Sequence, residues 1–258
     1  VPGQHRLIAA LKRANAILAV SKGHLKEGLA NRSYGLSPVF QYLKEQQKEL
    51  GYVYNGIFAP NQVPERLKAL NDEHAHKLGF RGPGKPLSQL SNEEKALWKH
   101  DNKKALQKRL QQINPSFDDN PNNTVIGIST RIVKQKGLNI LYQKVAVNGV
   151  VKTLLEHLLD GDGQGTSKIQ LAFLGTPGAN DKYGEDLVKF LEVFLVQHPQ
   201  YADRFVFIKS FDPVLAKQIG AGADLFLMPS IDEPGGIANL ELALLLAFGI
   251  VTNRGGLN

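Results

Sequence analysis

The chain has 258 residues, of which 42% are hydrophobic and 21% are charged, a composition typical of a globular protein with one large or two small domains. It contains no cysteine, which excludes disulfides and thiolate metal sites, and no apolar run of about 18 residues, so we expect no transmembrane helix. The net charge of +7 suits an anionic ligand, and without a basic stripe interleaved with aromatic residues the sequence does not favour nucleic acid.

The first segment of the chain reads as a helix followed by a buried strand. Apolar residues recur at helical spacing over 7–14, and an apolar run follows at 16–20. The pattern then predicts a polar helix over 36–49 and a short strand over 51–57, which ends in an Asn-Gly turn signal.

The middle of the chain carries one clear helix start. Residues 81–86 hold two glycines and two prolines and predict a loop. Ser91 is followed three residues later by Glu94, the pattern of a capping box, and the helix is expected to run to about Gln112. Trp98, the single tryptophan, is expected to pack inside the protein rather than to touch a ligand.

Short apolar runs alternate with helical patterns through the second half of the chain. We predict strands at 124–129, 169–175, 204–209, 225–228 and 250–252. The helices expected between or beside them cover 138–159, 185–198, 214–219 and 236–248. This alternation predicts an α/β fold, a parallel sheet with helices on both faces. In such a sheet, ligands bind outside the carboxyl ends of the strands.

Charged loops follow two of these predicted strands, and one of the loops ends in a pair of glycines. Arg131 and Lys136 lie in the loop after the first strand, and Glu233 lies in the turn Asp-Glu-Pro-Gly-Gly after the fourth. Arg offers phosphate a planar fork and Lys a point charge, so these two cations suit a phosphate group. The amide groups at the start of the helix after Glu233 also favour an anion.

These loops resemble the donor-site signature of the GT-B glycosyltransferases, most closely the glycogen and starch synthases. In that family a strand of the type ADLFLMPS leads into E-P-x-G-L, a helix and a Gly-Gly-Leu turn, and two glutamates are separated by seven residues, as Glu233 and Glu241 are here. The run STRIVKQKG resembles the family's S-R-L-x-x-Q-K-G, with Thr130 inserted before Arg131. Looser matches occur at 20–21, 55–57, 102–107 and 174–178.

The resemblance implies a Rossmann-like, GT-B donor-binding domain over 50–258, preceded over 1–49 by the end of an N-terminal, acceptor-side domain and a linker. It further implies that the donor domain is incomplete at its C-terminal end. Most of the first domain, including its lysine-glycine-glycine loop, would also be missing. We therefore expect the fragment alone to be inactive.

The implied reaction is the transfer of a hexose, with retention, from an ADP-, UDP- or GDP-sugar to a hydroxyl of an acceptor glucan. Arg131 and Lys136 would stabilise the leaving diphosphate, and Glu233 the sugar and its oxocarbenium-like transition state. Glu241 would bind the ribose, and Phe211 would stack on the base, although Phe211 could equally be a core residue. The backbone would approach the ligand at glycines: Gly175, Gly235, Gly236, Gly255 and Gly256.

A divalent metal is not expected, and neither is a cofactor other than the nucleotide-sugar substrate. The run Asp160-Gly161-Asp162 is a D-x-D pattern of the GT-A class or a possible calcium loop, but Leu171 stands where a calcium loop needs a glutamate. We interpret it as a surface turn. His74 and His76 lack partners at ligand spacing.

Two departures from the family pattern leave the donor and the acceptor open. The family's E-P-C-G is Glu-Pro-Gly-Gly here, and Ile231 and Asp232 stand where an Arg-Phe type pair is usual. One alternative is a protein-modifying glycosyltransferase, such as a bacterial effector secreted into a host cytosol, with another donor such as GDP-mannose. Another is a catalytically dead domain that binds a protein or a nucleic acid. The first interpretation predicts a cytoplasmic protein without a membrane partner.

Overall fold

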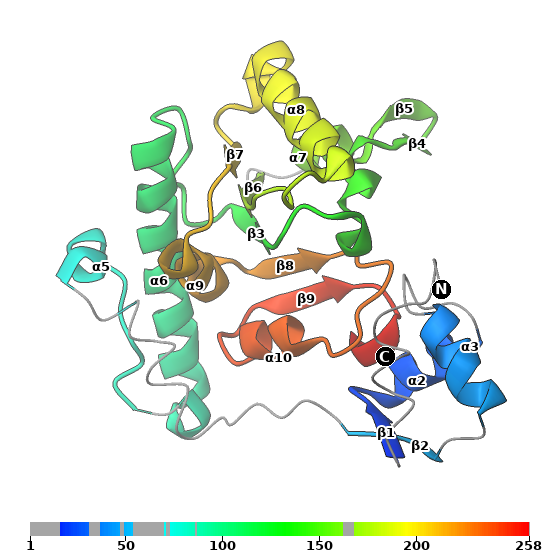
Figure 1. Ribbon diagram of the computed structural model, residues 1–258. Helices are drawn as coiled ribbons and strands as arrows, with labels where there is room; N and C mark the ends of the chain where they lie inside the picture. Colours follow the sequence, from blue (N-terminus) through cyan, green and yellow to red (C-terminus); the bar gives the residue numbers. More distant parts are fainter. Residues whose placement is uncertain are drawn as a thin grey trace.

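The five strands predicted in the second half of the chain form one parallel sheet. A computed structural model describes residues 16–30, 37–46, 49–53, 70, 73–85, 87–161 and 168–257. The strand order is β7-β6-β3-β8-β9, and the strands are β3 (Thr124–Ser129), β6 (Ile169–Leu174), β7 (Phe205–Ile208), β8 (Leu225–Met228) and β9 (Phe248–Val251). Their carboxyl ends point toward the N-terminal segment of the chain (Figure 1).

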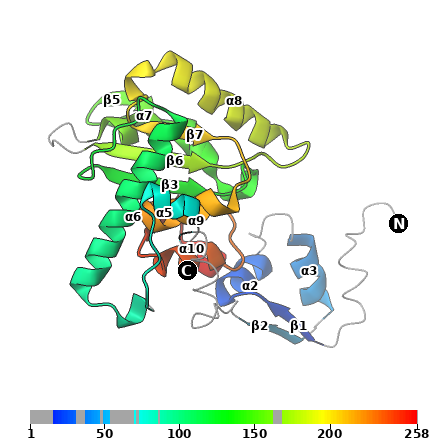
Figure 2. The same cartoon turned by 90° about the vertical axis from the view of Figure 1, so that its left-hand side faces the viewer.

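Helices cover both faces of this sheet, which confirms the expected fold class. α7 (Leu154–Asp160) and α8 (Lys182–Gln197) lie on one face, and α6 (Asn92–Ile113), α9 (Pro213–Gly222) and α10 (Ile237–Ala243) on the other (Figure 2). Successive residues of a strand point to opposite faces. In β3, Val125 accordingly packs with α6 and α9, whereas Ile126 and Ile128 pack with α7 and α8.

The long helix α6 is fastened to the sheet by polar side chains. Its predicted capping box is present, with Ser91 accepting from the backbone of Glu94 and the Glu94 carboxylate accepting from the backbone of Ser91. Further along α6, buried Gln107 donates to the side chain of Gln170 on β6 at 2.9 Å, and the ammonium of Lys103 lies 2.7 Å from a carboxylate oxygen of Asp224. The segment 102–107 is therefore a structural joint between helix and sheet.

The helix predicted over 138–159 is wrong for most of its length. Two 3₁₀ turns, η3 (Lys134–Lys136) and η4 (Leu138–Tyr142), are followed by an antiparallel hairpin of β4 (Lys144–Val147) and β5 (Val150–Thr153), and only α7 is helical. Asn148 and Gly149 connect the hairpin strands with φ values of 49° and 79°. An Asn-Gly pair with positive φ at both positions fits a two-residue hairpin turn, and the flanking valines favour strands.

The helix after the acidic turn is shorter than predicted. α10 ends at Ala243 rather than near Phe248, because Leu246 adopts a left-handed φ of 58° and the amide of Ala247 returns to the carbonyl of Leu242 at 3.0 Å. Phe248 and Gly249 consequently belong to β9, which pairs with β8 in parallel. The last strand, predicted at 250–252, thus begins two residues earlier, at Phe248, whose side chain is 76% exposed.

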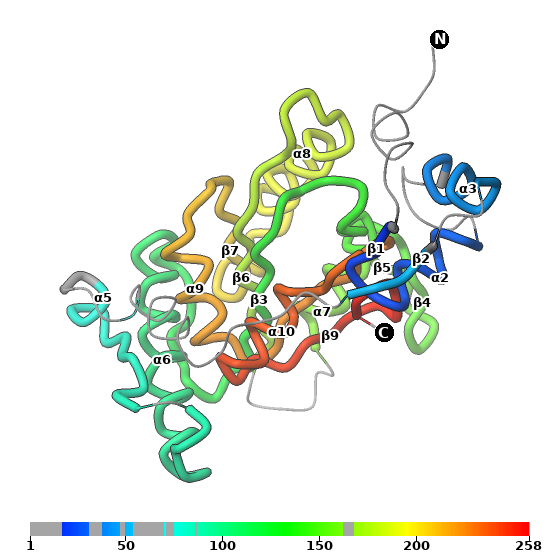
Figure 3. Tube along the Cα trace, turned by 60° about the horizontal axis from the view of Figure 1, so that its bottom comes forward, coloured from blue at the N-terminus to red at the C-terminus, as the bar shows by residue number. Residues whose placement is uncertain are grey.

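The N-terminal segment forms a small parallel pair of strands with two helices. β1 (Ala16–Ala19) pairs with β2 (Glu49–Tyr52), and α2 (Lys22–Leu29) and α3 (Ser37–Glu45) lie between them in the chain. The strand predicted at 16–20 is therefore present, whereas the helix predicted over 7–14 lies outside the described residues. α2 lies beside η6 (Gly255–Leu257) at the C-terminal end of the described chain (Figure 3). The domain boundary near Leu50 stays a prediction.

Two short elements, α5 (Glu73–Leu78) and η2 (Leu87–Gln89), lead into α6. The described part of the chain holds no helix that is both long and apolar enough to cross a membrane.

Candidate active site

Two loops that leave the carboxyl edge of the sheet are packed directly on each other. The loop after β3 and the turn after β8 are joined by a hydrogen bond from the amide of Ile231 to the carbonyl of Gln135, at 3.0 Å. Gly137 has a φ of 63°, and a Cβ at this position would overlap the carbonyl oxygen of Pro229. A glycine is needed here both for its backbone conformation and for the close approach. The basic loop and the acidic turn therefore meet, as the strand order predicts.

Lys136 and Glu233 form a nearly buried ion pair at this junction. The Lys136 Nζ lies 2.5 Å from Oε2 of Glu233, and the two side chains are 16% and 12% exposed. The hydroxyl of Ser230 donates to the same Oε2 at 2.9 Å. Among the described residues, both hydrogen bonds recorded for this carboxylate end on Oε2. Sequence reasoning placed Lys136 and Glu233 at the same edge of the sheet but did not single out Ser230.

The acidic turn rests on the Gly-Gly turn that follows β9. The amide of Gly256 donates to the carbonyl of Glu233 at 2.7 Å, and a Cβ at Gly255 would overlap that same carbonyl oxygen. Gly236 caps α10 with a φ of 62° and lies against Gly256. Close packing of one turn on the other therefore accounts for Gly236, Gly255 and Gly256. Gly235 is half-buried in the same turn.

The start of α2 closes this arrangement from the N-terminal side. The hydroxyl of Ser21 donates to the carbonyl of Pro234 at 2.7 Å and accepts from the amide of His24 at 3.0 Å. Gly23 lies two residues after Ser21, and a Cβ on Gly23 would overlap the carbonyl oxygen of Gly255. The turn that carries Glu233 is thus held by segments from both ends of the described chain.

Asp232, one of the residues that depart from the family pattern, is buried, with 2% of its surface exposed. It acts electrostatically on His24, which is also buried and lies edge-on to the ring of Phe40 at 5.2 Å between centroids. Burial lowers the pKa of His24 below its ordinary value, and the negative charges of Asp232 and Glu27 oppose that shift. Asp232 therefore belongs to the contact between the acidic turn and α2.

The residues assigned to the nucleotide side of the site are exposed. Arg131 is exposed at the start of the loop after β3. Phe211 is 85% exposed, so the alternative that it belongs to the core is wrong. It is followed by Asp212, whose side chain caps α9 through the amides of Val214 and Leu215. An exposed aromatic ring beside a capped helix start can accept a flat ligand, and base stacking stays a prediction.

The structure places the two remaining donor-site residues without showing a ligand role for either. Glu241 is half-buried on α10, the helix that follows the acidic turn. Gly175 follows β6, and a Cβ there would overlap the carbonyl oxygen of Thr130 in the loop after β3. Packing between neighbouring strand ends thus accounts for this glycine.

The D-x-D segment is engaged at its first residue. Asp160 ends α7, with Oδ2 at 2.7 Å from the Lys152 ammonium and Oδ1 accepting from the Tyr201 hydroxyl at 2.7 Å. Although burial opposes it, these two hydrogen bonds hold the pKa of Asp160 below its ordinary value. Asp162 and the side chain of His74 lie outside the described residues. Within the residues that are described, no three His, Asp or Glu side chains gather as metal ligands.

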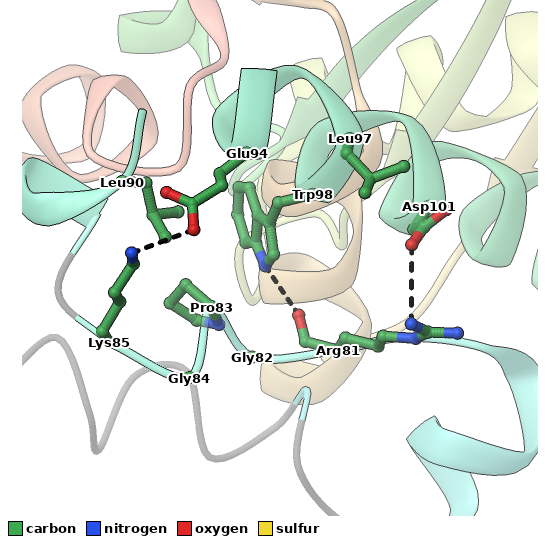
Figure 4. Close-up of a pocket in the computed structure, with 10 residues that line it drawn as sticks. All are labelled: Arg81, Gly82, Pro83, Gly84, Lys85, Leu90, Glu94, Leu97, Trp98 and Asp101. Carbon is green, nitrogen blue, oxygen red and sulfur yellow. Dashed lines mark hydrogen bonds and ion pairs between the residues drawn. The ribbon is translucent and has the colours of Figure 1, made fainter. Parts of the chain in front are cut away.

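A pocket of about 380 Å³ lies elsewhere, between the loop 81–85 and α6 (Figure 4). Two ion pairs cross its rim, Lys85 with Glu94 at 2.9 Å and Arg81 with Asp101 at 3.7 Å. Trp98 lies between them but is only 6% exposed, and its indole N–H donates to the Arg81 carbonyl at 2.8 Å. The tryptophan is therefore a packing residue, as predicted, and the pocket contains none of the predicted site residues.

Comparisons with known proteins point to one group. No family model matches the chain. It is 35% identical over 159 residues to a glycogen synthase of Thermosipho africanus, and this match covers 62% of the chain and 27% of that protein. It is 28% identical over 255 residues to a glycogen synthase of Desulforudis audaxviator, and this match covers 96% of the chain and 40% of that protein. The chain therefore spans well under half the length of these curated relatives.

A solved structure shows the same fold. The catalytic domain of starch synthase IV from Arabidopsis thaliana, bound to ADP and acarbose, superposes with a TM-score of 0.67 at 21% identity, over 98% of this chain and 42% of that one. The predicted resemblance to the GT-B glycogen and starch synthases is thereby confirmed. The relatives and the structure named here give no support to the effector alternative.

Proposed function

We propose that this chain is the donor-binding part of a retaining glycosyltransferase that transfers a hexose from a nucleoside-diphosphate sugar to a glucan hydroxyl. The observation that carries the proposal is the nearly buried Lys136–Glu233 pair at the carboxyl edge of the sheet. The chain is similar to glycogen synthases and shares its fold with a starch synthase bound to ADP. Both findings support a nucleotide-sugar donor and a glucan acceptor.

The two charges of the pair suit the two charges that develop in this reaction. When the bond between the anomeric carbon and the diphosphate breaks, its electron pair leaves with the diphosphate, where Lys136 and Arg131 would neutralise it. The sugar gains positive, oxocarbenium-like character, which the carboxylate of Glu233 would stabilise. The acceptor hydroxyl then attacks from the face that the diphosphate leaves and gives its proton to a diphosphate oxygen, so the configuration at the anomeric carbon is retained.

The nucleotide would lie over the exposed residues of the same edge. Phe211 presents its ring to solvent beside the capped start of α9, which suits stacking with a base. We further propose that Glu241 binds the ribose, because a carboxylate accepts hydrogen bonds from two hydroxyls at once. The choice among adenine, uracil and guanine follows from none of these contacts, since every base has a face to stack.

We propose that no divalent metal is needed, because Arg131, Lys136 and the amides at the start of α10 supply a positive field for the diphosphate. Titrating ADP, UDP and GDP into the protein with and without a chelator tests this. For each nucleotide, the affinity is expected to be the same with and without the chelator. A strict requirement for magnesium would contradict the proposal and restore Asp160 and Asp162 as candidate ligands.

The function itself is tested on the full-length protein with ADP-, UDP- and GDP-glucose and a glucan primer. Sugar incorporation from one of these donors is expected, whereas the chain of 258 residues alone should bind nucleotide without transferring sugar. Sugar transfer to protein but not to glucan would favour a protein-modifying enzyme. Failure to bind any of the three nucleotides would overturn the donor-site assignment altogether.

A further inference from the structure

The side chain of Ser230 is placed to orient Glu233. It is fully buried, and its hydroxyl donates to Oε2 of Glu233 at 2.9 Å. Ser230 precedes the acidic turn, so it is fixed to the end of β8 rather than to the turn itself. Its carbonyl accepts from the hydroxyl of Thr252 at 2.5 Å, which joins it to the segment that follows β9. The donor is thus anchored to two adjacent strand ends.

Lys136 contacts the same carboxylate oxygen but has a second task. Its ammonium is paired with Oε2 of Glu233. A bound diphosphate competes for that ammonium, because its oxygens carry more negative charge than one carboxylate. As Lys136 shifts toward the diphosphate, its hold on Glu233 weakens. Ser230 is neutral and buried, so the diphosphate does not draw it away from the carboxylate.

We propose that Ser230 is a positioning residue that keeps the Glu233 carboxylate in its reactive orientation while Lys136 is shared with the leaving diphosphate. Because Ser230 and Lys136 both bind Oε2, the other oxygen, Oε1, is the one presented to the sugar. This inference rests on the proposed function. It adds that the orientation of the carboxylate is set from β8, independently of the ligand.

A matched control separates positioning from simple packing. Ser21 is also a fully buried serine whose hydroxyl donates to the acidic turn, but it binds the backbone carbonyl of Pro234 at 2.7 Å and not the Glu233 carboxylate. Ser21→Ala and Ser230→Ala therefore each delete one buried hydroxyl that donates to the same turn. Only Ser230→Ala removes a donor to the proposed reacting group.

The experiment measures kcat and KM for sugar transfer, the Kd of the free nucleoside diphosphate and Tm, on the full-length protein and both variants. Ser230→Ala is expected to lower kcat about tenfold, in line with the loss of one hydrogen bond to a charged group, and to leave KM and Kd within twofold. Ser21→Ala is expected to lower Tm but to leave kcat within twofold. Ser230→Cys keeps a weak donor of similar size, so its kcat should lie between those of the wild type and Ser230→Ala.

Three outcomes would overturn the inference. One is an unchanged kcat in Ser230→Ala while the wild type transfers sugar, which leaves the proposed function intact. Another is an equal loss of kcat in Ser21→Ala and Ser230→Ala, which would make Ser230 a packing residue only. The third is a wild-type protein that transfers no sugar from any donor, because the proposed function and the positioning role then fall together. If Ser230→Ala does not fold, a Ser230→Cys variant with wild-type kcat overturns the inference in its place.

Discussion

Two lysine–carboxylate pairs lie at opposite edges of the same sheet, and they differ in what surrounds them. At the amino edge, Lys103 of α6 lies 2.7 Å from Asp224, which precedes β8, with side chains 11% and 31% exposed. At the carboxyl edge, Lys136 lies 2.5 Å from Glu233, with side chains 16% and 12% exposed. Distance and burial alone do not tell one pair from the other.

The neighbours of each pair make the distinction. Oδ2 of Asp224 also accepts from the amide of Val125, whose carbonyl in turn accepts from the amide of Asp224, so that pair joins β3, β8 and α6. At the carboxyl edge, Oε2 of Glu233 accepts from Lys136 and from Ser230, and the loop that carries Lys136 also carries exposed Arg131. A buried ion pair thus becomes a candidate site when it joins two loops at the carboxyl edge of the sheet and an exposed cation lies on one of those loops.

Removing one partner of the pair at the amino edge should have the largest effect on stability. Lys103→Ala leaves Asp224 without its counter-charge at a partly buried position, and we expect a loss of about 3 kcal/mol in the free energy of unfolding. Denaturant titration measures this, and sugar transfer per folded molecule should be unchanged. A stable Lys103→Ala protein that has lost activity would contradict the proposal, because the functional pair would then be Lys103–Asp224 at the amino edge.

The corresponding changes at the carboxyl edge should affect chemistry instead. Glu233→Gln removes the charge that favours an oxocarbenium ion, and we expect kcat to fall about a hundredfold, or about 2.7 kcal/mol. Its nucleotide affinity should be unchanged or slightly higher, because the variant no longer competes for Lys136. Lys136→Ala should weaken nucleotide binding by about tenfold and lower turnover as well.

Isothermal titration with the nucleotide and a transfer assay on the full-length protein check both variants. Equal loss of nucleotide affinity in Glu233→Gln and Lys136→Ala would show that Glu233 only shapes the turn. The proposed catalytic role of Glu233 would then have to be dropped.

Phe211 tests whether the open part of the carboxyl edge binds the base. Because its ring is 85% exposed, Phe211→Ala should leave the free energy of unfolding nearly unchanged. It should weaken nucleotide binding by about 1 to 3 kcal/mol, the range for stacking of one base on an aromatic side chain. Equal affinity in wild type and variant would remove Phe211 from the site. Val196 on α8 is 81% exposed, and Val196→Ala serves as the surface control.

The smallest effect concerns pH at the amino edge, where Lys99 donates to the carbonyls of Gly220 and Leu245 at 3.2 and 3.1 Å. Burial lowers its pKa to about 7, against the attraction of Asp224 and with the repulsion of Lys103. Above pH 7 the unfolded chain then binds more protons than the folded one, so stability should rise with pH, by about 1 kcal/mol between pH 7 and 8. Denaturant titrations at both pH values measure the slope. Lys99→Met should lack this increment, and an equal slope in both proteins would contradict the assignment.

The sheet could be predicted from the sequence because its signals are local. Each of the five strands is a short apolar run, and β3 and β8 were bounded to the residue. The hairpin was missed because leucines and valines over 138–159 also fit a helix, and the Asn148-Gly149 turn signal was not weighed against that periodicity. The end of α10 was missed because it depends on Leu246 in a left-handed conformation, which β propensity and periodicity do not report.

The site could be predicted only in part, for a related reason. Motif spacing located Lys136 and Glu233, because residues at the carboxyl ends of adjacent parallel strands must lie close together. It could not indicate that Ser230 and Lys136 bind one oxygen, which depends on rotamers. Ser21 escaped because its partner, Pro234, is remote in the sequence, and nothing local to either residue signals the contact.

The hydrogen bond between Ser21 and Pro234 spans 213 positions of the chain. Closing a loop of that length has a high entropic cost, and folding pays it after nearby contacts have formed. The sheet can assemble from successive βα units, whereas the turn bearing Glu233 gains this restraint only when α2 docks. During stepwise unfolding, the reverse order leaves a species with an intact sheet and a loosened turn, so amide protons of the turn should exchange with solvent before those of β3 and β6.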